Sequence, residues 1–332
     1  MSLITQYKKE RQSADSEDSS LPDKLNEFYA RFDRENTSTP VPLPCDNHDP
    51  PFLVTEQETR RALTRLNMNK AAGPDNIKPR LLKTCSNQLA SVFTFIFNWS
   101  LTTSTIPLCF KQSTIVPVPK KPSPETLNDY RPVALTSVIM KCFEKFVLSY
   151  INSLLPPNFD VFQFAYRINR SIDDDIAINT HKILTHLERK KSYARILFID
   201  YSSAFNTIVP RKLYTKLVQD LKFPISICNW VLDFLLNRPQ VVRIGNISSS
   251  AIVLNTGTPQ GCPLSPKLYS IFTYDCKAEF PGCLLIKFAD DTTVTGLVDN
   301  INENNFLRQI ESTVQWCREN NLKLKVSKTK EL

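Results

Sequence analysis

Three aspartates stand where apolar, strand-like segments end. Asp200 closes the run "YARILFID", and Asp290 with Asp291 interrupts "CLLIKFADDTTVTGLV" between two apolar stretches. Carboxylate oxygens are hard ligands suited to Mg²⁺, and two such ions about 3.5 to 4 Å apart can activate an attacking hydroxyl and stabilise a leaving phosphate. If the two segments are neighbouring strands, the three carboxylates meet at one sheet edge and repel each other unless a cation neutralises them. The pattern also fits a solvated hairpin turn, because such turns favour Asp in any case.

The helices that must carry these strands follow from capping signals and apolar periodicity. Thr55 with Glu58 and Ser171 with Asp174 form capping boxes, each ahead of an amphipathic run. The acidic run Asp173 to Asp175 is interpreted as charge that favours a helix N-terminus and not as a second metal site. Spacing of apolar residues predicts helices in "QETRRALTRLN", from residue 89 to about 101, over 137–155 and 171–188, and in "PRKLYTKLVQDL", "ISICNWVLDFLLN", "KLYSIFTYDC" and "NENNFLRQIESTVQWCREN".

Short strands alternate with these helices. "TIVPVPKK" is interrupted by prolines and predicts an edge strand at best, whereas "YARILFID" predicts a buried strand. "PQVVRIG" and "SAIVLNTG" are joined through Gly245 and Asn246, a hairpin signal, and "LKLKV" resembles a last strand. This order indicates an α+β fold with helices packed against one face of a mainly antiparallel sheet. Residues 1–50 are polar and then proline-rich, which predicts an extended linker and a domain boundary near Pro51.

Composition narrows the class of protein. The 332 residues carry a formal net charge of +8, with basic residues spread along the chain, which favours a polyanionic partner such as nucleic acid. Nine cysteines without a C-x-x-C pair indicate free thiols in a reducing compartment. No apolar run is long enough to span a membrane and the first residues lack a signal-peptide core. We therefore expect a protein that is neither secreted nor membrane-bound, in the cytoplasm or the nucleus.

Several motifs, in order, resemble those of one polymerase family. "LFIDYSSAFNTI", "NTGTPQGCPLSP" and "IKFADDTTV" look like motifs A, B and C of a reverse transcriptase palm, and "VPVPKK", "NDYRPVAL" and "QFAYRINRS" resemble the fingers of non-LTR (LINE-type) retrotransposon enzymes. The resemblance runs from about residue 21 to the last residue. It implies right-hand polymerase fingers and palm, with the antiparallel palm sheet backed by helices. The domains would be the linker over 1–50, a helical extension with the fingers over 51–190, and over 191–332 the palm with motifs A, B, C and the start of D, fingers and palm being interleaved.

By this resemblance the chain stops before a thumb, and the endonuclease of such elements is expected from a separate or missing segment. The implied partners are an RNA template, a DNA primer and dNTPs. The implied cofactor is a pair of Mg²⁺ ions, with Mn²⁺ as a possible substitute. Asp200 would bridge both ions, Asp290 and Asp291 would complete the triad, and the backbone carbonyl of Tyr201 would assist. Lys328 could be the motif D lysine that protonates the leaving pyrophosphate.

The resemblance also assigns contacts to the substrates. Lys120 and Arg131 would grip the triphosphate, where an ammonium and a guanidinium suit phosphate oxygens. Phe205 would lie under the sugar and exclude a 2′-hydroxyl. The remaining residues are Gln260 and Gly261 beside the incoming base, and Gln163, Arg167 and Ser171 facing template and nucleotide.

Three functions remain open at this level. The first is an RNA-directed DNA polymerase (reverse transcriptase), a nucleotidyltransferase that adds dNTPs to a primer 3′-hydroxyl. The second is a catalytically inactive retroelement remnant that only binds nucleic acid. The third, an RNA-dependent RNA polymerase, is disfavoured because those enzymes usually carry a polar residue where this chain has Phe205.

Overall fold

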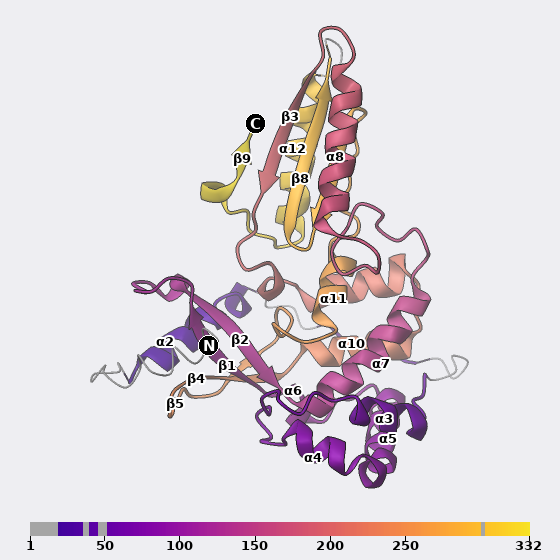
Figure 1. The fold of residues 1–332 in the computed structure, drawn as a ribbon, viewed down its shortest axis with the longest axis vertical. Helices are drawn as coiled ribbons and strands as arrows, with labels where there is room; N and C mark the ends of the chain where they lie inside the picture. Colours follow the sequence, from indigo (N-terminus) through magenta and orange to yellow (C-terminus); the bar gives the residue numbers. More distant parts are fainter. Residues whose placement is uncertain (1–18, 36–39, 46–51, 300–302) are drawn as a thin grey trace.

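The computed structural model describes residues 19–35, 40–45, 52–299 and 303–332. Its architecture mixes helices with two separate β-sheets (Figure 1). One sheet lies on the left of that view with helix α2, the other forms the upper part of the molecule, and most of the remaining helices lie between and below them.

The first sheet has the strand order β2-β1-β4-β5, with β6 paired to β4. Its strands are β1 (Ser113–Pro119), β2 (Tyr130–Thr136), β4 (Arg238–Ile244), β5 (Ile247–Ser248) and β6 (Ile252–Leu254). The hairpin predicted around Gly245 and Asn246 is confirmed, because β4 pairs antiparallel with both β5 and β6.

The prediction that "TIVPVPKK" is at best an edge strand is wrong. Strand β1 lies inside the sheet, between β2 and β4. The prolines are accommodated because Pro117 lies opposite Pro132 of β2, and the parallel pairing with β4 uses only Ser113 to Ile115, ahead of both prolines of the strand. A residue without an N–H is tolerated where no ladder bond is required of it.

The second sheet is antiparallel throughout, in the order β7-β8-β3-β9. Its strands are β3 (Tyr193–Ile199), β7 (Cys283–Phe288), β8 (Asp291–Val298) and β9 (Lys330–Glu331). The final strand is displaced from its predicted place, because "LKLKV" contributes only an isolated bridge between Leu324 and Tyr201. Strand β3 is less buried than predicted, with Phe198 41% exposed.

Helices cover both faces of this sheet, not one face as predicted. Thr295 of β8 donates a hydrogen bond to Asn179 of α8 (Ile172–Leu187). The next residue, Gly296, lies directly against Phe306 of α12 (Glu303–Glu319), where an added Cβ would be 2.5 Å from the ring. Successive residues of a strand point to opposite faces, so α8 and α12 lie on opposite sides (Figure 1).

The remaining helices share one hydrophobic core with the second sheet, which contributes Leu285 and Val294 to it. These helices are α3 (Glu56–Thr64), α4 (Pro79–Thr84), α5 (Ser86–Thr103), α6 (Leu108–Lys111), α7 (Val138–Leu154), α9 (Pro210–Thr215), α10 (Ile225–Leu235) and α11 (Ser265–Phe272). Phe97 of α5 stacks on Phe143 of α7 at 4.4 Å, and Phe143 meets Trp230 of α10 edge-on at 5.1 Å. Both predicted capping boxes are present, ahead of α3 and α8. The helix predicted in "PRKLYTKLVQDL" begins as α9 and continues as a π-helical turn from Lys216 to Asp220.

The N-terminal segment is not an extended linker where the structure describes it. Helix α2 (Leu21–Ala30) packs on the first sheet and buries Leu25 and Tyr29 with Val242 of β4. Residues 40–45 lack regular structure, yet Leu43 receives a hydrogen bond from the Asn229 side chain of α10. The linker prediction also covers residues 1–18, 36–39 and 46–50, which lie outside the described residues.

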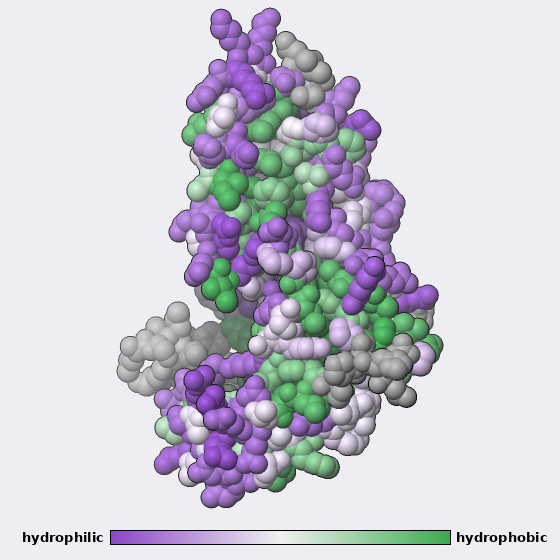
Figure 2. All heavy atoms as spheres, turned by 90° about the vertical axis from the view of Figure 1, so that its right-hand side faces the viewer, coloured by the Kyte–Doolittle hydropathy of each residue, from purple (hydrophilic) through white to green (hydrophobic). Residues whose placement is uncertain are grey.

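The surface mixes polar side chains with hydrophobic patches on the face drawn in Figure 2. Helix α5 exposes Phe95 by 73% and Trp99 by 45%. Of the helices that the structure describes, none is long and apolar enough to cross a membrane. All nine cysteines lie within the described ranges and are free thiols.

Candidate active site

The strand register brings the aspartates to one edge of the second sheet. Ile199 of β3 lies opposite Thr292 of β8, so the residues that follow and precede them, Asp200 and Asp291, face each other across the strand pair. Asp290 lies in the two-residue turn between β7 and β8, and its neighbour Asp291 is the first residue of β8. The prediction that the strand ending at Asp200 lies next to the Asp-Asp hairpin is confirmed.

The electrostatics of this edge reflect crowded negative charge. Burial, followed by the charges of Asp290 and Asp200, raises the pKa of Asp291, and Lys328 opposes the rise. The Lys328 ammonium lies 3.6 Å from a carboxylate oxygen of Asp200. A cation near these carboxylates therefore stabilises their ionised forms.

The backbone around Asp200 is fixed by the segment that leads to Lys328. The Lys325 N–H donates to the carbonyl of Asp200 at 2.8 Å, and the Ser202 N–H donates to the carbonyl of Lys323 at 2.8 Å. This pairing uses the carbonyl of Asp200 and not that of Tyr201, so the metal contact expected of the Tyr201 carbonyl stays a prediction. The Tyr201 side chain itself is buried at 5% exposure.

The donor chemistry of this edge fits a hard divalent cation. Mg²⁺ is usually held by one or two carboxylates together with substrate phosphates and water. Within the described ranges, no three His, Cys, Asp or Glu side chains are grouped closely enough to hold a metal ion. The aspartates of this edge would therefore share an ion with phosphate, water or backbone oxygens, which would fill the remaining positions.

A basic hairpin from the first sheet accompanies the acidic edge. Arg131 pairs with Val118 in the β1–β2 ladder, and Lys120 follows at the end of β1. The Lys120 ammonium donates to the carbonyl of Asn128 at 2.6 Å. Burial, and then the positive charges of Lys325, Arg131 and Lys328, lower the pKa of Lys120. Lys120 is therefore repelled by cations from two distant parts of the chain. A bound polyanion would reduce this repulsion.

Phe205 and the loop after β6 are bonded together. The Thr258 N–H donates to the carbonyl of Phe205 at 2.8 Å, and the Phe205 ring lies 4.9 Å from the ring of Tyr269 on α11. Gln260 and Gly261 follow in this loop, both exposed, and Gly261 has a φ of 93°. The loop is therefore bound to the backbone of Phe205 at Thr258 and leaves Gln260 and Gly261 exposed.

The three residues expected to face the template have other partners. Gln163 is 1% exposed, and its side chain binds the backbone of Ala289. Ser171 is the N-cap of α8 and binds Asp174 through both its N–H and its hydroxyl. Arg167 donates to the carbonyl of Asp160 at 3.1 Å and stays half-buried. Of the three, only Arg167 and Ser171 keep exposed atoms, so the expected template contact of Gln163 is corrected to a backbone contact.

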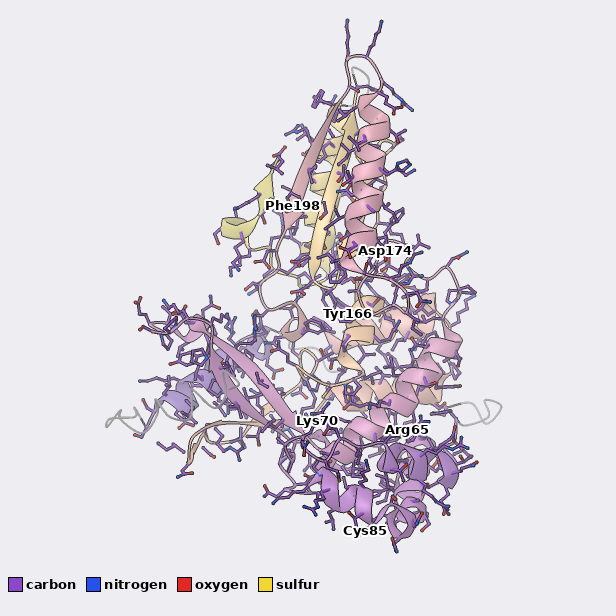
Figure 3. All side chains as sticks on the ribbon, in the orientation of Figure 1. Arg65, Lys70, Cys85, Tyr166, Asp174 and Phe198 are labelled. Carbon is purple, nitrogen blue, oxygen red and sulfur yellow. The ribbon has the colours of Figure 1, made fainter. Side chains whose placement is uncertain are left out.

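Two residues close to the three aspartates were not predicted as site residues from the sequence. Asp175, read only as helix N-terminal charge, lines the same hollow as Asp200 and Asp291, and burial and then Asp291 raise its pKa. Tyr166 has a left-handed φ of 61°, and burial, Asp290 and Asp291 raise its pKa. Figure 3 places Tyr166 below the start of α8, which is marked by Asp174, and Phe198 on β3 above it. Helical spacing could have identified Asp175, because it shares a face with Asn179, which contacts β8.

Comparison with known proteins agrees with this arrangement. A family model described as "Reverse transcriptase (RNA-dependent DNA polymerase)" matches residues 118–332. The chain is 27% identical over 83% of its length to the "Probable RNA-directed DNA polymerase from transposon BS" of Drosophila melanogaster, and 25% identical over 84% to the "RNA-directed DNA polymerase from mobile element jockey" of the same organism. It covers 32% and 31% of these relatives, so it spans about a third of their length. It is also 24% identical over 66% to the "Retrovirus-related Pol polyprotein from type-2 retrotransposable element R2DM", of which it covers 20%.

Proposed function

The chain belongs to the reverse transcriptase (RNA-dependent DNA polymerase) family, and we propose that it extends a DNA primer on an RNA template, using dNTPs, as the polymerase region of a LINE-type retrotransposon. The observation that carries the proposal is the meeting of Asp200 with the Asp290–Asp291 hairpin at one sheet edge, accompanied by the cations Lys120 and Arg131. In this proposal the second sheet is the palm, and the β1–β2 hairpin belongs to the fingers.

Asp200 and Asp290 are the proposed ligands of two divalent ions, with Asp291 as the weaker third carboxylate. Reverse transcriptases as a family depend on divalent metal, and Mg²⁺, or Mn²⁺ in its place, would supply charge neutralisation and activate the primer 3′-hydroxyl. Burial, and then the charges of Asp290 and Asp200, raise the pKa of Asp291, and a bound cation would favour its ionised form.

The other residues position the nucleotide. Lys120 and Arg131 hold the triphosphate, the ring of Phe205 lies beneath the sugar, and Gln260 with Gly261 contacts the base. Catalysis then consists mainly of alignment of the 3′-hydroxyl with the α-phosphate and of stabilisation of the charge that develops there. Arg167 and Ser171 are the proposed template contacts.

The test is incorporation of labelled dTTP on poly(rA) with an oligo(dT) primer and Mg²⁺. Wild type is compared with Asp200→Asn and Asp290→Ala, and with Asp173→Asn, an exposed aspartate of α8, as the matched control. We expect incorporation by wild type and the control and at least a 100-fold loss in the two site variants. Incorporation no greater than that of Asp200→Asn, by a folded protein that still binds RNA in a salt-dependent way, would instead identify a nucleic-acid-binding remnant.

A further inference from the structure

Residues 162–164 lie beside Lys287 of β7, and the Gln163 side chain reaches Ala289, the residue before Asp290. The Lys287 N–H donates to the carbonyl of Phe162 at 2.8 Å, and the Phe164 N–H donates to the carbonyl of Lys287 at 2.9 Å, which makes a parallel bridge between Gln163 and Lys287. The segment therefore makes an isolated bridge to β7, which is the edge strand of the second sheet.

The Gln163 side chain continues this pairing past the end of β7. The Ala289 N–H donates to Gln163 Oε1 at 3.0 Å, and Gln163 Nε2 donates to the carbonyl of Ala289 at 3.2 Å. The Ala165 N–H donates to the same Oε1 at 3.1 Å, which fixes the orientation of the amide. The amide thus supplies both hydrogen bonds that a neighbouring backbone residue would give, and it does so for the residue directly before Asp290.

Ala289 needs this support because of its backbone conformation. Its φ is 57°, in the left-handed region, where a side chain is disfavoured and two-residue turns usually place glycine. A change of φ at Ala289 rotates the following peptide, and with it the direction of the Asp290 side chain. The two hydrogen bonds from Gln163 oppose that change.

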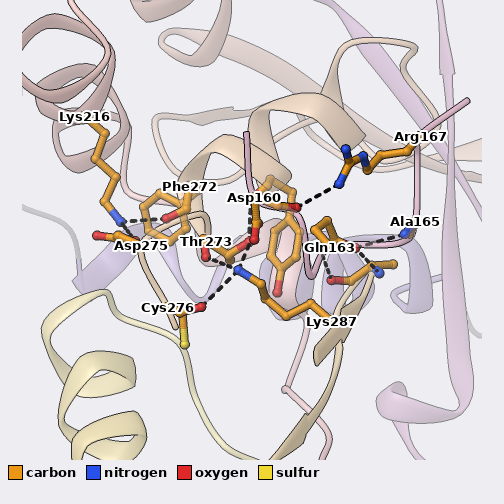
Figure 4. A network of polar contacts seen from close by, with 12 residues as sticks. Asp160, Gln163, Ala165, Arg167, Lys216, Phe272, Thr273, Asp275, Cys276 and Lys287 are labelled. Carbon is orange, nitrogen blue, oxygen red and sulfur yellow. Dashed lines mark hydrogen bonds and ion pairs between the residues drawn. The ribbon is translucent and has the colours of Figure 1, made fainter. Parts of the chain in front are cut away.

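The base of this arrangement is a buried ion pair. Lys287 Nζ lies 2.9 Å from an Asp160 carboxylate oxygen and donates to the carbonyls of Thr273 and Cys276 at 2.7 and 3.1 Å (Figure 4). Arg167 donates to the Asp160 carbonyl. The segment that carries Gln163 is therefore bound to β7 by a side-chain ion pair and by backbone hydrogen bonds.

We propose that Gln163 is a positioning residue that holds Ala289 in its left-handed conformation and so sets the direction of Asp290 toward divalent metal. This inference rests on the proposed function, because it presumes that Asp290 binds metal. It differs from a template contact, since both polar atoms of the Gln163 amide are used by protein backbone and the side chain is 1% exposed.

A measurement of metal binding distinguishes the positioning role of Gln163 from a purely structural role. Mn²⁺ bound to the protein is measured by electron paramagnetic resonance of the free ion, with primer–template affinity measured by fluorescence anisotropy and folding by thermal unfolding. The variants are Gln163→Met, which keeps length but removes the amide, Ala289→Gly, which adopts positive φ without help, and the double variant. Gln315→Met, on α12, is the matched control, and Asp290→Ala defines loss of the site.

We expect Gln163→Met to weaken Mn²⁺ binding about 10-fold or more, as is typical when an outer partner of a metal ligand is lost, with primer–template affinity within about twofold of wild type. Ala289→Gly in the double variant should restore most of the lost Mn²⁺ affinity, because glycine holds the turn on its own. A template contact gives no reason for that rescue. Unchanged Mn²⁺ binding, or a loss confined to primer–template affinity, overturns the proposal.

Two further results keep the test decisive. If Gln163→Met is unfolded at the assay temperature, Ala289→Val replaces it, since a β-branched residue is strongly disfavoured at positive φ; undiminished Mn²⁺ binding by that variant overturns the proposal. If wild type binds no more Mn²⁺ than Asp290→Ala, the metal site itself is absent, and the proposed function fails together with this inference. If wild type binds Mn²⁺ through Asp290 and Gln163→Met does so equally well, only this inference fails.

Discussion

Asp160 and Lys287 form an ion pair of 2.9 Å in which both side chains are almost completely buried, at 4% and 3% exposure. The pair joins the segment before α8 to β7 beneath the Asp290 turn. Lys287 also donates to two backbone carbonyls, so its charge has three partners. Burial raises the pKa of Asp160, and the Lys287 ammonium opposes the rise because it stabilises the ionised carboxylate.

Removal of one partner of this pair should therefore cost more than removal of both. Lys287→Met leaves a buried, uncompensated carboxylate, and we expect the free energy of unfolding to fall by about 3 to 5 kcal/mol. The Asp160→Asn/Lys287→Met double variant should recover part of that loss, because no charge then stays buried. Urea unfolding measures both, with Lys190→Met at an exposed loop as the control. Equal losses in the single and double variants would contradict this account.

Glu144 of α7 gives the stability of the protein a predictable dependence on pH. Its side chain is fully buried, one oxygen accepts from the Leu264 N–H at 3.1 Å, and burial raises its pKa from 4.5 to about 7. Between these values the folded state holds a proton that the unfolded state releases, so stability falls as pH rises from about 4.5 to 7 and is level beyond. Glu144→Gln should remove this slope and raise the free energy of unfolding by up to about 3 kcal/mol at pH 8.

Urea unfolding at pH 5 and pH 8 checks the Glu144 prediction. The exposed Glu311 on α12 provides the matched Glu311→Gln control, which should behave as wild type at both values. A wild-type stability that increases from pH 5 to pH 8, or an unchanged slope in Glu144→Gln, would show that another group dominates the titration.

Two glycines of the loop after β6 should respond differently to alanine. Gly257 has a φ of 75°, and an added Cβ would lie 2.7 Å from the Asn206 Cα, a backbone atom that cannot move away cheaply. Gly261 has a φ of 93°, but its nearest neighbour, the Ala134 carbonyl oxygen, would be 3.7 Å from the added atom. We expect Gly257→Ala to lower the free energy of unfolding by about 2 kcal/mol or more, and Gly261→Ala to cost about 1 kcal/mol from backbone strain alone. Chemical unfolding of the two variants side by side decides the order.

The parts of the fold that sequence predicted are those where a local signal coincides with the tertiary structure. The capping boxes at Thr55 and Ser171 mark real helix starts, and the apolar run before Asp200 is a strand that ends where the aspartate begins. The Asp-Asp segment lies between paired strands for the same reason, since an apolar run stands on each side of it.

Features that depend on distant partners were missed. Pro117 suggested an edge strand, but the register that sets it opposite Pro132 depends on a second strand whose position no local pattern reveals. Helix α2 was predicted to be part of a linker because its apolar side chains, such as Leu25, are buried only by the first sheet, which lies far away in the sequence. Gln163 was assigned to the template for a similar reason: nothing nearby in sequence indicates that Ala289, 126 positions away, uses both of its amide atoms.

Phe205 should control the choice between deoxy- and ribonucleotides. Its ring is partly buried against Tyr269, and its carbonyl is held by Thr258, so the side chain is fixed and cannot yield to a 2′-hydroxyl. We expect Phe205→Ala to raise incorporation of rUTP relative to dTTP about 10- to 100-fold, the range that one lost steric contact can supply. Phe95→Ala, at an exposed position of α5, is the control. A wild type that prefers rUTP would indicate an RNA polymerase instead.

Lys328 can act as a proton donor or only as a positive charge, and its place near Asp200 allows both. Its ammonium lies 3.6 Å from the Asp200 carboxylate and the side chain is 63% exposed, so solvent screens much of the attraction and leaves the group free to reach a leaving pyrophosphate.

Lys328→Arg keeps the charge, but a guanidinium does not release its proton in this pH range. If Lys328 is a general acid, both Lys328→Arg and Lys328→Gln should lower kcat about 100-fold or more. If it only neutralises charge, Lys328→Arg should behave as wild type while Lys328→Gln raises KM for dTTP with kcat unchanged. Steady-state kcat and KM of these variants, with Lys330→Gln on β9 as the control, distinguish the two roles because the arginine variant separates charge from proton transfer.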